Sequence, residues 1–288
     1  MFPTVHRHVN KLVCGEPLDW ASAGLNYKLQ NLGIKFEHGV SIGFGDGSKE
    51  FKLMNDDIVN KFTLFELSEE RIKVATKKAK LYGLTDRVQF IKGDYNLHKF
   101  DEDVDFVHWN NALHHMLNVE EAVKWSYEIL VNGGVFYMDD YVGPSRFQWT
   151  DAQLQLGTRI REILPDRYLK NIMEPDKLLD RTILRPDVRS IENMDPSEAA
   201  DSSSILNKIK KYFPDADINL TGGCVYNPAL NDVFSNINES DEKDKTILEL
   251  LLIIDDLATK AGVEPLYATA LAIKNDNILK LIQRKISR

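Results

Sequence analysis

Short apolar runs alternate with helical patterns between residues 39 and 142. These runs are apolar on both sides of the expected strand, as is required of a sheet that helices cover on both faces. Alternating strands and helices are typical of βαβ units around a parallel sheet. The expected strands are Gly39–Ile42, Phe62–Glu66, Val88–Ile91, Val104–Trp109, Gly134–Tyr141, Ile218–Thr221 and Leu266–Ile273. We therefore predict an α/β fold with a seven-stranded, mostly parallel sheet.

Helix ends are marked by capping residues. Ser68, followed by two glutamates, is a good N-cap, and Gly83 stands where a C-terminal cap is expected. The sequence therefore predicts a helix over residues 69–82. Two further helical patterns predict helices over about residues 120–130 and 245–261.

The alternation of strands and helices stops after Tyr141, where Val142–Ser145 contains both Gly and Pro. About sixty residues of helical and irregular sequence follow, which is longer than an ordinary connection. Thr150–Asp151 and Asp201–Ser204 are expected to cap helices that end at Leu164 and Tyr212. We therefore expect one compact domain, made of an N-terminal segment (1–38), a core (39–143), an inserted helical cap (144–212) and a C-terminal part that completes the sheet (213–288).

Composition narrows the classes of partner. The 288 residues include 44 acidic and 36 basic ones, and the net charge of -8 makes nucleic acid an unfavourable substrate or partner. The tail after Lys280 is the one short basic stretch. Only Cys14 and Cys224 are present, which fits a reducing compartment. The first residues lack the apolar core of a signal peptide, and the longest apolar run, Leu250–Ile254, is far too short for a bilayer. We expect a cytoplasmic protein with no membrane partner.

The segment Gly43-Phe44-Gly45-Asp46-Gly47 runs from an expected strand into a helix. Glycines there allow positive φ angles and the close approach of a ligand to the backbone. Glu66 ends the next strand 23 residues after Gly43, where a carboxylate can accept hydrogen bonds from ribose hydroxyls. Nicotinamide dinucleotides and S-adenosylmethionine both use this geometry. Ser48 departs from the third glycine of the dinucleotide pattern, so the sequence favours S-adenosylmethionine, whose cationic sulfonium suits acidic surroundings.

Two further segments carry a resemblance to a known family. Gly93-Asp94 after the third strand, and Val104–His115 over and after the fourth, strongly resemble class I S-adenosylmethionine-dependent methyltransferases, which have a Rossmann-like sheet. The resemblance implies that Asp94 contacts the adenine amino group and that the methionine end lies against Trp109 and Asn110. We also expect segment 1–38, which precedes the first strand, to cover the cofactor. The expected cofactor-binding residues are Gly43, Gly45, Gly47, Glu66, Leu67, Asp94, Tyr95, Trp109 and Asn110.

One position departs from the family pattern. The family usually has Asp or Glu two residues before the first glycine, and this chain has Ser41. An acceptor for the cofactor's ammonium is therefore expected to be missing, unless Ser41 or a backbone carbonyl replaces it through a water.

Three segments resemble a narrower branch of these enzymes, which is often seen near bacterial surface-glycan genes. They are Asp139–Trp149, Asp195–Ala199 and Gly222-Gly223. We expect methyl transfer to an oxygen or nitrogen of a small molecule, with a sugar or a phosphorylated or carboxylated metabolite of surface-glycan biosynthesis as one acceptor class. Two alternatives stay open. They are a catalytically silent nucleoside-binding protein on the same fold and, with less support, a nicotinamide-dependent oxidoreductase.

Methyl transfer is a direct displacement, so alignment supplies most of the acceleration and a general base is optional. His115 and Tyr141 follow strand ends and are the expected bases, although His114-His115 could equally be a packing motif. The expected substrate-binding residues are His114, Asp140, Arg146 and Glu198. Arg146 could clamp a carboxylate or phosphate, or form an internal salt bridge. No metal is expected, because no Cys or third His lies near the histidine pair.

Overall fold

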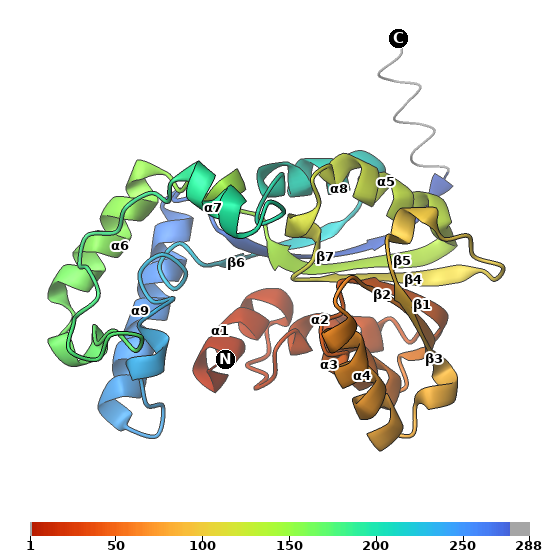
Figure 1. The fold of residues 1–288 in the computed structure, drawn as a ribbon, viewed down its shortest axis with the longest axis horizontal. Helices are drawn as coiled ribbons and strands as arrows, with labels where there is room; N and C mark the ends of the chain where they lie inside the picture. Colours follow the sequence, from red (N-terminus) through yellow and green to blue (C-terminus); the bar gives the residue numbers. More distant parts are fainter. Residues whose placement is uncertain (1, 277–288) are drawn as a thin grey trace, which may run out of the picture. The chain divides into compact units, whose positions relative to one another are not determined.

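The fold is described from a computed structural model, which covers residues 2–276, so the basic tail after Lys280 lies outside the described part of the chain. The described residues contain one seven-stranded sheet with the strand order β3-β2-β1-β4-β5-β7-β6. Its strands are β1 (Phe36–Ile42), β2 (Val59–Glu66), β3 (Val88–Lys92), β4 (Val104–Asn110), β5 (Leu130–Tyr141), β6 (Asp217–Gly222) and β7 (Tyr267–Ile273). The neighbours from β3 to β5 pair in parallel. The predicted α/β, Rossmann-like fold is confirmed (Figure 1).

The helices follow the expected pattern, with one difference in capping. They are α1 (Pro3–Cys14), α2 (Ala23–Asn31), α3 (Ser48–Asn55), α4 (Glu69–Leu81), α5 (Val119–Ile129), α6 (Asp151–Ile163), α7 (Val188–Met194), α8 (Ile205–Tyr212) and α9 (Glu242–Lys260). Ser68 Oγ accepts the N–H of Arg71 and so caps α4 as predicted. The run Asp201–Ser204 stands directly before α8 as predicted, but its N-cap residue Ser204 makes no side-chain capping hydrogen bond, and the Asp201 carboxylate accepts the N–H of Val119 at the start of α5.

The chain divides into two compact units, which are described separately. The first, here called the helical unit, consists of residues 1–24, 141–199 and 220–268. The second, here called the sheet unit, consists of residues 25–140, 200–219 and 269 onward. These units combine distant stretches of chain, whereas the four segments expected from the sequence follow one another along it.

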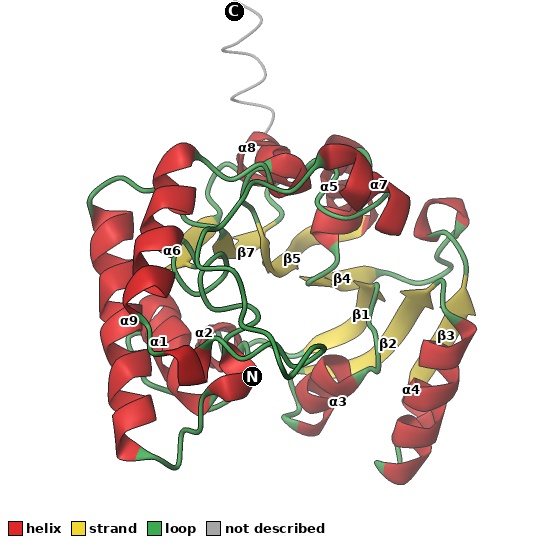
Figure 2. Cartoon of the chain, turned by 60° about the vertical axis from the view of Figure 1, so that its left-hand side comes forward, coloured by secondary structure: helices red, strands yellow, loops and turns green. Residues whose placement is uncertain are grey.

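The sheet unit has three layers. Helices α3 and α4 cover one face of the strands, and α5 and α8 cover the other (Figures 1 and 2). The core between the layers is aromatic and includes Phe62, Phe106, Trp109 and Phe136, each with no more than 1% of its surface exposed. This packing is what the continuous apolar strands predict, since both faces of the sheet need a cover.

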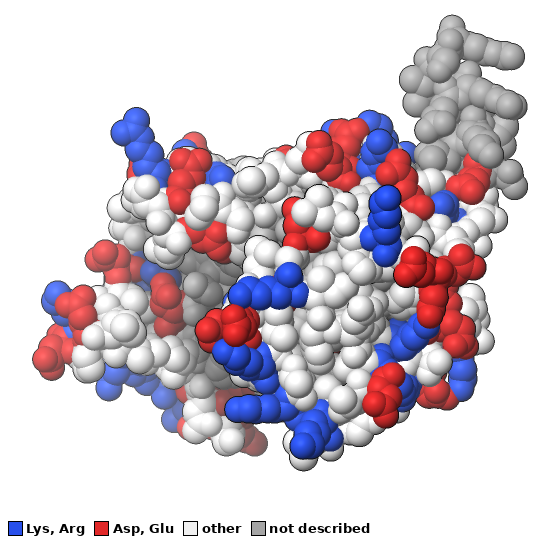
Figure 3. Space-filling view, turned by 45° about the vertical axis from the view of Figure 1, so that its right-hand side comes forward, with Lys and Arg blue, Asp and Glu red and all other residues white. Residues whose placement is uncertain are grey.

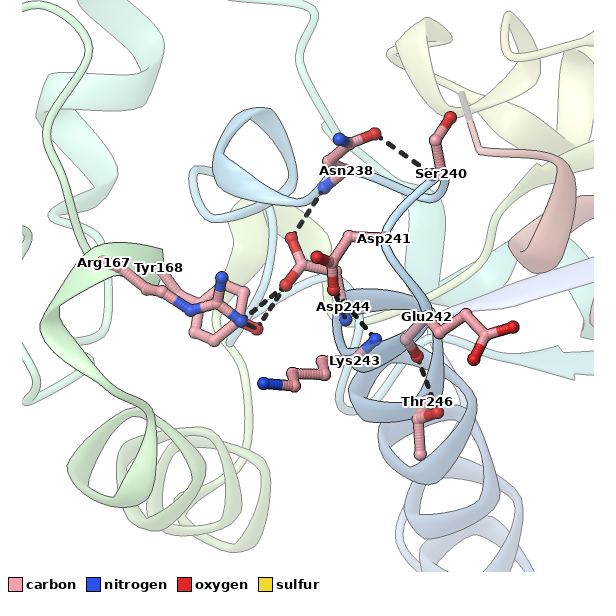
Figure 4. A network of polar contacts seen from close by, with 9 residues as sticks. All are labelled: Arg167, Tyr168, Asn238, Ser240, Asp241, Glu242, Lys243, Asp244 and Thr246. Carbon is pink, nitrogen blue, oxygen red and sulfur yellow. Dashed lines mark hydrogen bonds and ion pairs between the residues drawn. The ribbon is translucent and has the colours of Figure 1, made fainter.

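The helical unit contains α1, α6, α7 and α9. Its apolar core includes Val5, Ile160 and Leu248, one from each of three of these helices. The first turn of α9 is held by Asp244, whose carboxylate accepts the hydroxyl of Tyr168 at 2.6 Å and the backbone N–H of Asn238 at 2.9 Å (Figure 4). Arg167 donates to the same carboxylate. Burial by itself would raise the pKa of Asp244. The hydrogen bonds and the charge of Arg167 outweigh that effect and lower the pKa.

The surface carries charges of both signs. Basic and acidic side chains are interspersed on the face drawn in Figure 3. Among the described residues no helix combines the length and the apolar character needed to cross a membrane.

The start of α6 offers a test of the fold. Thr150 and Gln153 form a reciprocal capping box, in which Thr150 Oγ1 accepts the Gln153 N–H and Gln153 Oε1 accepts the Thr150 N–H. We expect Thr150→Ala to lower the free energy of unfolding by about 1 kcal/mol, because one helix N–H loses its acceptor. Urea unfolding followed by circular dichroism measures this loss. Thr150→Ser keeps the hydroxyl and is the matched control; equal loss in both variants would contradict the cap.

Candidate cofactor site

The three glycines after β1 have different surroundings. All have positive φ angles, +64° at Gly43, +64° at Gly45 and +75° at Gly47. A Cβ at Gly43 would lie 2.9 Å from the Cβ of Ala112, and one at Gly47 would lie 2.6 Å from the ring of Phe51. A Cβ at Gly45 would meet no atom within 4 Å. Two glycines are therefore needed for packing within the protein, while Gly45 is the point where the turn is open to a ligand.

Glu66 lies against this turn. Its Oε1 accepts the backbone N–H groups of Leu67 at 2.9 Å and Ser68 at 3.0 Å, and its Oε2 accepts the N–H of Gly45 at 3.3 Å. Arg71 stands 3.8 Å from Oε2. The structure thus brings Glu66 and Gly45 together, as the predicted ribose site requires. The Leu67 side chain is exposed, so its N–H is the part of the residue that contributes to this arrangement.

Asp94 and Tyr95 follow β3 at the same edge of the sheet. The exposed Asp94 carboxylate accepts the N–H of Asn96 at 2.9 Å and so begins a short turn. The Tyr95 ring is buried edge-on against Trp109 and Trp125, at centroid distances of 5.6 and 4.5 Å. Burial raises the pKa of Tyr95 to about 12. Tyr95 is therefore a neutral aromatic wall, and contact of Asp94 with adenine stays a prediction.

The two residues that end β4 face in opposite directions. The Trp109 side chain is fully buried and donates through Nε1 to Ser126 Oγ at 2.9 Å, so only its backbone can face a ligand. Asn110 lies beside the glycine turn, because β1 and β4 pair Ile42 with Trp109. Its Oδ1 accepts a hydrogen bond from Lys49 Nζ on the first turn of α3. Sequence analysis did not single out Lys49.

A buried polar cluster lies behind the turn, formed by Ser41, Glu50 and His108. Ser41 Oγ donates to Glu50 Oε1 at 2.8 Å, and His108 Nδ1 lies 2.9 Å from the same oxygen. Burial by itself would raise the pKa of Glu50, but the contacts with His108 and Ser41 outweigh it and lower that pKa, so the carboxylate is charged. Glu50 Oε2 has no hydrogen-bond partner among the described residues. Sequence analysis noted Ser41 but missed Glu50 as its partner.

Asp140 holds the loop after β4. Its Oδ2 accepts the N–H groups of Ala112 at 3.0 Å and Leu113 at 2.7 Å, and its Oδ1 lies 2.5 Å from His114 Nδ1. The Asp140 side chain is fully buried. These contacts give it a positioning role, in which it orients the imidazole of His114. The ring of His115, one of the two expected bases, is 4.1 Å from that of His114 and is partly exposed.

The other expected catalytic and substrate residues belong to the helical unit. Tyr141 is buried, donates its hydroxyl to the carbonyl of Pro144 at 3.1 Å, and has a pKa that burial raises further above its usual value. A phenol of this kind is a poor base at neutral pH. Arg146 Nη1 donates to the carbonyl of Glu198 at 3.0 Å, and Arg146 Nε lies 3.8 Å from Glu192. These internal contacts agree with the salt-bridge alternative for Arg146.

Three residues with positive φ angles lie where the segment after β5 meets residue 199. Arg146 has φ +55°, Phe147 has φ +50° and Ala199 has φ +47°, and the N–H of Arg146 donates to the carbonyl of Ala199 at 2.7 Å. Each such angle costs a non-glycine residue on the order of 1 kcal/mol, so the surrounding contacts must hold it in place. The segment is therefore a rigid, strained part of the helical unit.

The glycine turn, Glu66 and Asn110 fall within a stretch with a recognised family pattern. Residues 40–138 match the model of a family described as a methyltransferase domain. This stretch of the chain is therefore similar to a methyltransferase domain. The match supports S-adenosylmethionine as the expected cofactor of the glycine turn. No curated protein is significantly similar to the whole chain in sequence.

Solved structures resemble the chain in fold. A geranyl diphosphate C-methyltransferase from Streptomyces coelicolor A3(2) is 13% identical, with a TM-score of 0.51, over 90% of this chain and 77% of that protein. An S-adenosylmethionine-dependent methyltransferase from Clostridium acetobutylicum is 14% identical, with a TM-score of 0.39, over 51% of this chain and 54% of that protein. The chain therefore spans about half the length of the second structure. At 13% identity the Streptomyces structure shows a shared fold and nothing finer.

The buried Glu50 leads to a prediction about acid stability. Because folding lowers the pKa of Glu50 from its ordinary value of 4.5, the ionisation of this side chain stabilises the folded chain above about pH 4.5, and this contribution is lost as the pH falls toward the folded-state pKa. The stability of wild type relative to Glu50→Gln should therefore decrease below pH 4.5, by up to about 1.4 kcal/mol per pH unit. Urea unfolding of both proteins between pH 7 and pH 3 measures the difference. A constant difference over this range would contradict a lowered pKa.

Proposed function

We propose that this protein transfers the methyl group of S-adenosylmethionine to an oxygen or nitrogen of a small-molecule acceptor. The observation that carries the proposal is the contact between Glu66 and the open glycine Gly45 inside the stretch that matches the methyltransferase family. The contact supports the proposal because Glu66, as a ribose acceptor, would stand next to Gly45, where the turn is open. A surface-glycan acceptor is the finer prediction from the sequence, and the acceptor screen should begin with sugar nucleotides and small phosphorylated or carboxylated metabolites.

The residues of the sheet unit suit the parts of the cofactor. Glu66 would accept hydrogen bonds from the ribose hydroxyls, Asp94 would accept from the adenine amino group, and Tyr95 would offer an aromatic wall to the purine. Asn110 is at the methionine end, next to Gly43. When bound, the cofactor supplies a methyl group on a positively charged sulfur, which makes the carbon electrophilic. The protein has to bind it, exclude water and align the acceptor.

His114 is the best-placed base in the sheet unit. The Asp140 carboxylate next to Nδ1 favours the tautomer in which Nδ1 carries the proton, so Nε2 is the basic nitrogen. When the acceptor's oxygen or nitrogen is methylated, His114 Nε2 would take up the proton that this atom loses. This assignment differs from the first expectation, His115, and rests on the carboxylate that orients His114.

Ligand binding tests the function directly. We expect S-adenosylmethionine and S-adenosylhomocysteine to raise the melting temperature, and NAD to leave it unchanged, because a ligand at 100 times its Kd stabilises by about 2.7 kcal/mol. Gly45→Ala should weaken S-adenosylhomocysteine binding at least tenfold in calorimetry, since the added methyl group enters the open face of the turn.

Gly83→Ala is the matched control. Gly83 also has a positive φ, +70°, and open space around its Cβ, but it lies at the far end of α4, about 20 Å along the helix from Ser68. Both variants pay the same backbone strain, so only Gly45→Ala should lose affinity. Stabilisation by NAD alone would instead favour the oxidoreductase alternative.

Turnover separates the two histidines. Once an acceptor has been identified, we expect His114→Gln to lower kcat by 100-fold or more, because the general base is removed, while the Kd of S-adenosylhomocysteine stays within twofold. His115→Gln should lower kcat much less. The measurement is product formation followed by mass. The opposite ranking of the two variants would assign the base to His115.

A further inference from the structure

Glu50 is a buried carboxylate with one oxygen that makes no hydrogen bond to the described residues. The side chain is 1% exposed and ionised, and both polar contacts described above fall on Oε1. Oε2 has no partner among residues 2–276. A buried carboxylate is costly unless its oxygens are satisfied, so an unfilled oxygen at full burial calls for a further partner or use.

The position of Glu50 relates it to the glycine turn. Ser41, its hydrogen-bond partner, lies two residues before Gly43 on β1, and His108 lies two residues before Asn110 on β4. Two residues of a strand span about 6.6 Å. The carboxylate contacts the side chains of these two residues, so it lies on the face of the sheet that α3 covers, roughly that far along the strands behind the level of the turn.

Lys49 supplies the opposite charge at the level of the turn. It precedes Glu50 in the first turn of α3, and its Nζ donates to Asn110 Oδ1. Asn110 follows the paired residues Ile42 and Trp109, so this ammonium lies beside Gly43. One short stretch of helix thus offers a cation at the turn and an anion behind it.

We propose that Lys49 and Glu50 recognise the amino-acid end of the cofactor, with Lys49 pairing with its α-carboxylate and Glu50 attracting its α-ammonium. The inference rests on the proposed function. The two charges complement those of a zwitterion, and the low dielectric behind the turn strengthens the attraction of Glu50 over several ångströms. Glu50 contacts Ser41 directly, so α3 provides the negative charge that β1 lacks at that position.

The test compares two ligands that differ at this end alone. S-adenosylhomocysteine carries the amino acid, whereas 5′-methylthioadenosine keeps the adenosine and thioether without it. In calorimetry we expect Lys49→Met and Glu50→Gln each to weaken S-adenosylhomocysteine about tenfold or more, and to leave 5′-methylthioadenosine within twofold. Lys52→Met is the matched control, since Lys52 lies on the same helix and pairs with Asp56 at 2.9 Å. It should change neither affinity.

A charge-relocation variant distinguishes electrostatics from packing. Ser41→Asp combined with Glu50→Gln moves the carboxylate from α3 to β1, and it should recover most of the S-adenosylhomocysteine affinity that Glu50→Gln loses. Failure of this recovery would overturn the role of Glu50.

Two other outcomes overturn the pair. Equal weakening of both ligands by Lys49→Met and Glu50→Gln would mean a structural role, and no weakening of either ligand would mean no role. If Glu50→Gln does not fold, the proposal is tested with Lys49→Met alone. The Lys49 side chain is only half buried, so its replacement leaves the core intact. Wild-type protein that binds neither ligand would contradict the proposed function itself, which is a separate result.

Discussion

The carboxylate of Glu66 joins the end of β2 to the turn that follows β1. It accepts three backbone N–H groups, from Gly45, Leu67 and Ser68. Hydrogen bonds to a charged acceptor are stronger than those between neutral groups, so this one side chain holds the turn and the start of α4 together. Because β1 pairs in parallel with both β2 and β4, the ends of three strands are set relative to one another. The candidate site is built on this rigid edge of the sheet.

Two buried carboxylates support the edge from behind, and they differ in how fully they are used. Asp140 has hydrogen bonds on both oxygens, two from backbone N–H groups and one with His114, and this explains how a charge can be fully buried in the core. Within the described part of the chain, Glu50 has hydrogen-bond partners on one oxygen only. The first carboxylate is accounted for by the loop and the imidazole that it positions. The second keeps a negative potential behind the glycine turn, where a cationic cofactor is expected to bind.

The sequence predicted features that depend on neighbouring residues. The strands, the N-cap Ser68 and the capping residue Thr150 could be read because apolar runs and caps are local signals. Glu66 could be placed near the glycine turn because the carboxyl ends of neighbouring parallel strands lie at the same edge of the sheet. The direction of each side chain after β4 could not be read so well, since alternate residues of a strand face opposite ways. Trp109 consequently turns into the core while Asn110 faces the turn.

The part of the site that sequence reasoning missed depends on contacts between distant segments. Lys49 and Glu50 look like the polar face of an ordinary surface helix, and only their contacts with Asn110, Ser41 and His108 distinguish them. Asp201 is a similar case, because it stands just before α8 in the sequence while its carboxylate accepts a hydrogen bond from the start of α5.

The hydrogen-bond distances around Glu66 indicate how a ligand can bind without disturbing this edge of the sheet. The bonds of Oε1 to Leu67 and Ser68, at 2.9 and 3.0 Å, are shorter than the bond of Oε2 to Gly45, at 3.3 Å. Hydroxyl groups arriving at the turn therefore compete with the weakest of the three bonds, while the other two keep the carboxylate in place. A carboxylate that is already oriented loses little entropy when it binds the ligand, so more of the binding energy is retained as affinity.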